Sequence, residues 1–98
     1  MKKLPTNHTF RGKRYKIVMA TLKQLDGNDG DCDPPDEPEK IIRVNKALMK
    51  PGNERELLEV LIHEAIHVCQ WDLKEDAVED TGKAVADLVW RSGYRRII

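Results

Sequence analysis

His63-Glu64-Ala65-Ile66-His67 lies in the segment 53–69, NERELLEVLIHEAIHVC, where apolar residues recur every three or four positions. That spacing is typical of a helix with one buried face. Asn53, followed three residues later by Glu56, resembles a capping box at the start of this helix. The expected apolar stripe consists of Leu57, Leu58, Leu61, Ile62, Ala65, Val68 and Cys69. The pattern therefore predicts a packed helix that presents His63, Glu64 and His67 beside a cleft.

The H-E-x-x-H pattern of residues 63–67 predicts a metal ion. Residues four apart lie on one face of a helix, so the His63 and His67 imidazoles can bind the same ion. Glu64 is placed to reach a water molecule at that ion, as a general base does in zinc hydrolases. Two histidines with a carboxylate favour zinc or iron over magnesium. An ordinary pair of helix histidines is the alternative.

A third protein ligand is expected downstream, because catalytic zinc usually has three. Residues 53–81 contain no glycine or proline, and in one continuous helix Glu79 would lie about 18 Å beyond His67. Asp72 and Glu75, however, form a second potential capping box. A reversal of the chain near Asp72 would pack two helices antiparallel and favour Glu79 as the third ligand, with Glu75 as the alternative.

The remaining segments predict an α+β domain. Alternating apolar residues indicate strands at Phe10–Ala20 and Lys40–Asn45. Residues 26–39 are rich in aspartate, glycine and proline, which predicts an acidic loop, and their spacing does not fit a calcium-binding EF-hand. Residues 1–9 are expected to be a loose leader, and the second helix should end near Gly93. We expect a small twisted sheet of two or three strands, packed on the helix that carries His63 and on an antiparallel helix that carries the glutamate.

Length and composition indicate one domain, residues 1–98, without a strong electrostatic preference for a partner. The 17 basic and 17 acidic residues give no net charge, so nucleic-acid binding through the basic termini is not favoured. Cys32 and Cys69 are far apart and no signal peptide is recognisable, which favours a reducing cytoplasm. The sequence contains no apolar run long enough to span a membrane.

The segment Glu79-x-x-Gly82-x-x-Val85-Ala86 resembles the E-x-x-A-x-x-F-A helix of ImmA/IrrE-like peptidases. Together with H-E-x-x-H, it resembles the zincin metallopeptidases that use a glutamate ligand. The order strand, G-D-C-D loop, strand, L-I-H-E-A-I-H helix, glutamate helix is also similar to small SprT-like and phage-encoded zincins. This similarity covers residues 13–92.

The resemblance implies a zinc ion held by His63, His67 and a downstream glutamate, with Glu64 as general base. It also implies that the strand Lys40–Asn45 binds an extended peptide through backbone hydrogen bonds. The register Glu75-x-x-x-Glu79 resembles the E-x-x-x-D pattern of thermolysin-like enzymes, in which Glu75 would be the ligand and Glu79 its support. Candidates for stabilising the oxyanion are His8 and Tyr94.

These observations predict a zinc-dependent metallopeptidase that hydrolyses peptide bonds, with Glu64 as general base and a peptide or protein as substrate. The alternative is a zinc-stabilised module that binds a peptide or protein without cleaving it. The small size of the domain keeps that alternative open, because a short chain has little surface for a deep cleft.

Overall fold

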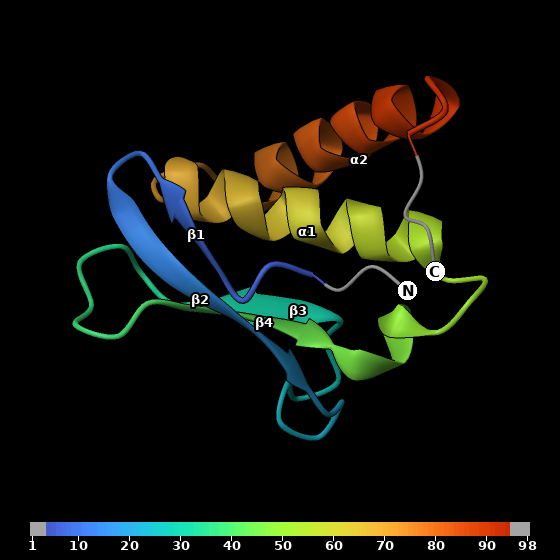
Figure 1. The fold of residues 1–98 in the computed structure, drawn as a ribbon. Coiled ribbons are helices and arrows are strands. Elements are labelled where there is room, and N and C mark those ends of the chain that lie inside the picture. The colour runs from blue at the N-terminus through green and yellow to red at the C-terminus, as the bar shows by residue number, and fades with distance from the viewer. Residues whose placement is uncertain (1–3, 95–98) are drawn as a thin grey trace.

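A four-stranded mixed sheet and two helices form an α+β domain in three layers (Figure 1). The computed structural model describes residues 4–94. Helix α1 lies on one face of the sheet, and helix α2 packs against α1 on the side away from the sheet. The elements in chain order are β1 (Asn7–Phe10), β2 (Lys13–Ala20), β3 (Gly30–Cys32), β4 (Ile41–Asn45), a 3₁₀ turn (Lys46–Met49), α1 (Glu54–Cys69) and α2 (Glu75–Arg91).

The sheet has the order β1-β2-β4-β3, and its four strands exceed the two or three expected. The predicted single strand Phe10–Ala20 is a hairpin instead, because Arg11 and Gly12 both have positive φ and form a two-residue turn between β1 and β2. The expected loose leader is therefore wrong for Asn7–Thr9, which pair with β2; positions 1–3 lie outside the described residues.

The acidic segment 26–39 is not a loop throughout. Its residues Gly30–Cys32 form β3, which pairs antiparallel with β4, and the backbone N–H of Asn45 extends the ladder to the carbonyl of Asp29 at 2.8 Å. Three residues are too few for alternation to reveal a strand, and pairing with β4 decides the outcome. The segment therefore contributes an edge strand next to α1.

The burial of β4 confirms the alternation that the sequence predicts. Ile42 and Val44 of β4 are buried, as their alternation predicts. The buried core to which they belong lies between the sheet and α1 and consists of Tyr15, Ile42, Val44, Leu48, Leu57 and Val68. Within the described residues no helix is long and apolar enough to cross a membrane. Cys32 and Cys69 are both free thiols.

The chain reverses between the helices as predicted, but neither capping box forms. Asn53 occupies the N-cap position of α1, yet its side-chain amide donates to the carbonyl of Ala47 at 2.9 Å. Lys74, rather than Asp72, occupies the N-cap position of α2. The predicted end of α2 near Gly93 is confirmed, and Gly93 has φ of 90°. Helix α2 therefore begins at Glu75, and this places that carboxylate in the turn facing the end of α1.

Candidate metal centre

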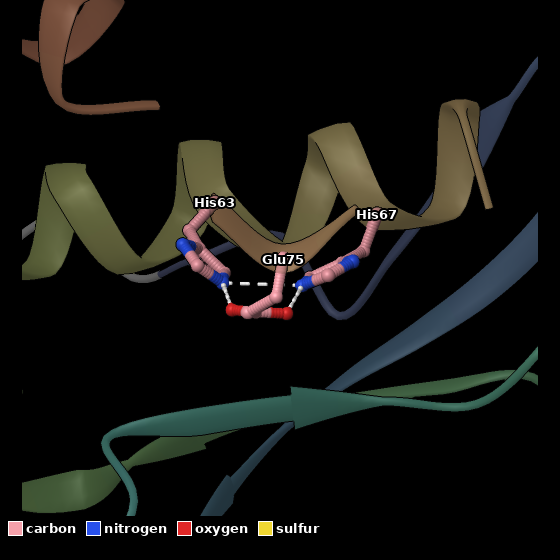
Figure 2. Close-up of side chains that lie close together, drawn as sticks. All are labelled: His63, His67 and Glu75. Carbon is pink, nitrogen blue, oxygen red and sulfur yellow. Dashed lines mark hydrogen bonds and ion pairs between the residues drawn. The ribbon is translucent and has the colours of Figure 1, made fainter. Parts of the chain in front are cut away.

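Three side chains converge where the end of α1 meets the start of α2. The Nε2 atoms of His63 and His67 are 3.1 Å apart. Glu75 places Oε1 at 3.0 Å from His63 Nε2 and Oε2 at 2.9 Å from His67 Nε2. Figure 2 shows the two rings side by side on α1, with the Glu75 carboxylate bridging them and β3 across from the group. This is the one group of potential metal ligands that residues 4–94 bring together.

The donor set fits a tetrahedral metal ion. Ligand distances of about 2.0 Å place the donors of a tetrahedral zinc ion about 3.3 Å from one another. The His63 and His67 nitrogens, 3.1 Å apart, lie close to that value, and each is within 3.0 Å of one Glu75 oxygen, Oε1 for His63 and Oε2 for His67. The Glu75 side chain is 67% exposed, so the group is open to solvent on one side. Two imidazoles, one carboxylate and an open side match the donor set of catalytic zinc sites.

The structure brings Glu75, and not Glu79, to the two histidines. The Glu79 carboxylate is bound instead by the Lys83 ammonium at 3.0 Å, one turn further along α2, and this ion pair lowers the pKa of Glu79. Antiparallel packing of the two helices predicted Glu79 as the ligand, but Lys83, four residues further on, pairs with it instead. The two helices approach closely at Gly82, which is buried; a Cβ built on it lies 3.6 Å from His63 Cα.

Glu64 lies beside the two histidines in a tightly packed position and is only 5% exposed. Strand β3 covers it, because a Cβ built on Gly30 would lie 3.2 Å from Glu64 Oε2. Burial raises the pKa of the Glu64 carboxyl, whereas a hydrogen bond from the Cys32 thiol and the nearby His63 and His67 act in the opposite direction. Burial and the Glu64 charge raise the pKa of Cys32, so this thiol stays protonated and donates.

A groove of about 700 Å³ runs between β3, α1 and the start of α2 and contains the whole group. Besides the predicted residues, its walls include Asp29, Asp31 and Cys32 from the β3 segment and Glu56 and Glu59 from α1. The periodicity of α1 already places Glu56 and Glu59 on the same face as His63, so the sequence contained that signal. The contribution of β3 depends on its pairing with β4 and had no local signal.

Two expected contributions to the groove are not found in this arrangement. Strand β4 lies between β2 and β3, so it has no free edge along which a peptide could pair, and the expectation for Lys40–Asn45 is wrong. The free edge beside the groove belongs to β3. His8 packs against Phe10 on the opposite edge strand, β1, and Tyr94 lines a separate apolar cavity. Neither candidate for oxyanion stabilisation lines the groove.

No protein-family model, curated protein or solved structure matches this chain.

Proposed function

We propose that this protein is a zinc-dependent metallopeptidase in which His63, His67 and Glu75 hold the ion. The observation that carries the proposal is that these three side chains place their donor atoms within 4.8 Å of one another, next to the buried carboxylate of Glu64. When bound, zinc polarises a peptide carbonyl and makes a water molecule more acidic. The donor set supports zinc over magnesium, which prefers oxygen ligands.

Glu64 moves the proton in the proposed reaction. Its carboxylate takes a proton from the attacking water as the new carbon–oxygen bond forms, and it returns that proton to the nitrogen when the carbon–nitrogen bond breaks. The Cys32 thiol and the β3 backbone around Gly30 keep the carboxyl oriented.

The substrate in this proposal is an extended peptide that binds beside β3. The outer edge of β3 has no strand partner within residues 4–94, and β3 forms one wall of the groove that contains Glu64. A peptide that hydrogen bonds to this edge would lie across from the histidines. The length of β3, three residues, limits this pairing to a short stretch of peptide.

The substitution Glu64→Gln tests the mechanism. We expect the variant to bind one zinc ion with unchanged affinity, because Glu64 is not among the three ligands, and to lose cleavage of an unfolded protein substrate by at least about a hundredfold. Zinc content and affinity are measured by competition with a chromophoric chelator. Glu37→Gln, an exposed change outside the groove, is the matched control. Unchanged turnover by Glu64→Gln would rule out the proposed role.

A second function is supported by the scarcity of cationic side chains in the groove. Among residues 4–94, the lining contains one lysine, Lys83, and no arginine, and the Lys83 ammonium is paired with Glu79. A groove whose one lysine is already paired favours a module in which zinc stabilises the fold and the groove binds a peptide without cleaving it. Zinc-dependent binding of peptides that wild-type protein leaves intact over long incubation would favour this function.

A further inference from the structure

The groove continues from the metal ligands toward the first turns of α1. Residues 56, 59, 63 and 67 follow one face of α1, at the spacing of three and four that aligns side chains on a helix. The β3 wall runs alongside, with Gly30 against Val60 of α1. The Asp29 carboxylate accepts a hydrogen bond from the side-chain amide of Asn45. Asn45 directly precedes the 3₁₀ turn that leads into α1. The groove therefore has one end near Glu56 and the other near Trp71.

The end near the first turns of α1 is acidic. Four carboxylates line it: Asp29, Glu56, Glu59 and Glu79. The one lysine in this part of the described lining, Lys83, forms an ion pair with Glu79 at 3.0 Å, and the charges of Lys83 and Glu59 also interact. No ion pair in the described part of the chain involves Glu56 or Glu59. We call these four carboxylates the acidic end of the groove.

The opposite end has a different character. Trp71 is 41% exposed there, and its ring is tilted by 57° to the His67 ring, with centroids 6.3 Å apart. The carboxylate on that wall, Asp31, is bound by the Arg43 guanidinium at 3.0 Å. The chain as a whole has no net charge, so the excess of carboxylates at one end of the groove is a local property.

Charge at the acidic end persists when the metal is bound. Among the described residues, the acidic end holds four carboxylates and one lysine, so it has three more negative than positive charges, and none of these residues belongs to the metal-ligand group. Carboxylates that line a concave surface attract cationic ligands. The outer edge of β3, which has no strand partner within residues 4–94, lies in the same groove and independently points to a peptide as the ligand.

We infer that the preferred substrates are basic peptides, in which a lysine or arginine side chain on one side of the cleaved bond lies at the acidic end. The backbone of the peptide follows β3, and its side chain on the other side of the bond meets Trp71. This inference rests on the proposed peptidase function for cleavage, but the preference for basic peptides also applies to binding alone.

The first test uses fluorescence-quenched peptides that differ only at the positions flanking the cleaved bond, where they carry lysine, glutamine or glutamate. We expect zinc-loaded protein to cleave the lysine series with kcat/KM about tenfold above the glutamine series, and the glutamate series slowest. Raising the salt concentration should reduce the difference, because exposed charges are screened. Equal rates for the three series would overturn the inference and leave the peptidase function intact.

The double variant Glu56→Gln/Glu59→Gln should lose most of the preference for lysine. Glu37→Gln/Glu39→Gln is the matched control, because it changes the net charge equally at exposed positions between β3 and β4, outside the groove. We expect the control to keep the full preference. An equal loss in both variants would assign the effect to overall charge and overturn the inference. Circular dichroism confirms that each variant is folded.

A binding measurement separates this inference from the peptidase function. Zinc-loaded Glu64→Gln is titrated with labelled lysine, glutamine and glutamate peptides and followed by fluorescence anisotropy. Selective binding of the lysine peptide, together with no cleavage by the wild type, would contradict the proposed peptidase function and support the preference for basic peptides. No selectivity in binding would overturn the inference whether or not the wild type cleaves.

Discussion

Gly30 is the position where an added methyl group should reveal how closely β3 packs on α1. A Cβ built there would lie 2.7 Å from Val60 Cγ1, a separation that real Cβ atoms essentially never show, and 3.2 Å from the Arg43 carbonyl oxygen and from Glu64 Oε2. The Gly30 φ is not in the left-handed region, so the cost of Gly30→Ala is steric. The matched comparison is Gly82→Ala, because a Cβ built on Gly82 meets nothing closer than His63 Cα at 3.6 Å.

The two substitutions should change stability in opposite directions. Overpacking of this kind costs about 1–3 kcal/mol, and restriction of the unfolded chain returns about 0.4–1 kcal/mol, so Gly30→Ala should destabilise by about 1–2 kcal/mol. Gly82 lies inside α2 with space for a methyl group, and Gly82→Ala should stabilise by about 0.5–1 kcal/mol. Adding Val60→Ala to Gly30→Ala removes the closest contact and should recover part of the loss as a coupling energy.

Denaturant unfolding, followed by tryptophan fluorescence with a chelator present, measures these free energies without a contribution from metal. The relevant quantity is the shift in midpoint at a constant m-value. A Gly30→Ala protein as stable as the wild type would refute the close approach of β3 to α1. If Val60→Ala gave no recovery in the Gly30→Ala background, the penalty would belong to the Arg43 carbonyl and Glu64 contacts. A destabilised Gly82→Ala would contradict the described crossing of α1 and α2.

Three further outcomes follow from the site and the core. Glu75→Gln should lower zinc affinity by more than about tenfold and Glu79→Gln by less than about threefold, as measured by chelator competition; equal losses would contradict Glu75 as the ligand. Adding zinc at a hundred times its dissociation constant should raise the free energy of unfolding by about 2.7 kcal/mol, reversibly with chelator, and no shift would exclude a site specific to the folded state. Tyr15 is buried, which raises its pKa to about 12. The folded state therefore holds this proton more tightly than the unfolded chain, so stability is fully present below pH 10 and falls as the pH rises through about 12. The difference in absorbance titration between the wild type and Tyr15→Phe measures the pKa of Tyr15, and a Tyr15 transition near 10 would refute this prediction.

The elements that the sequence predicts well are those with local periodicity. The apolar spacing of segment 53–69 places a helix there, and the same spacing places His63 and His67 on one face, because both depend only on helix geometry. Alternation likewise predicts β4, with Ile42 and Val44 buried. Gly93, in the left-handed region, confirms the predicted end of α2.

The parts that the sequence does not predict depend on contacts between distant segments. Strand β3 is three residues inside a segment of turn formers, and only its hydrogen bonds to β4 make it a strand that covers Glu64. The position of β4 inside the sheet, and hence which edge stays free, follows from the parallel pairing of β2 with β4. The sequence by itself determined that His63 and His67 share one helix face, with Glu64 next to His63 in the chain. The tertiary structure decided that Glu75 joins them, because the chain reverses after α1 and starts α2 at that residue, which brings its carboxylate to both histidines.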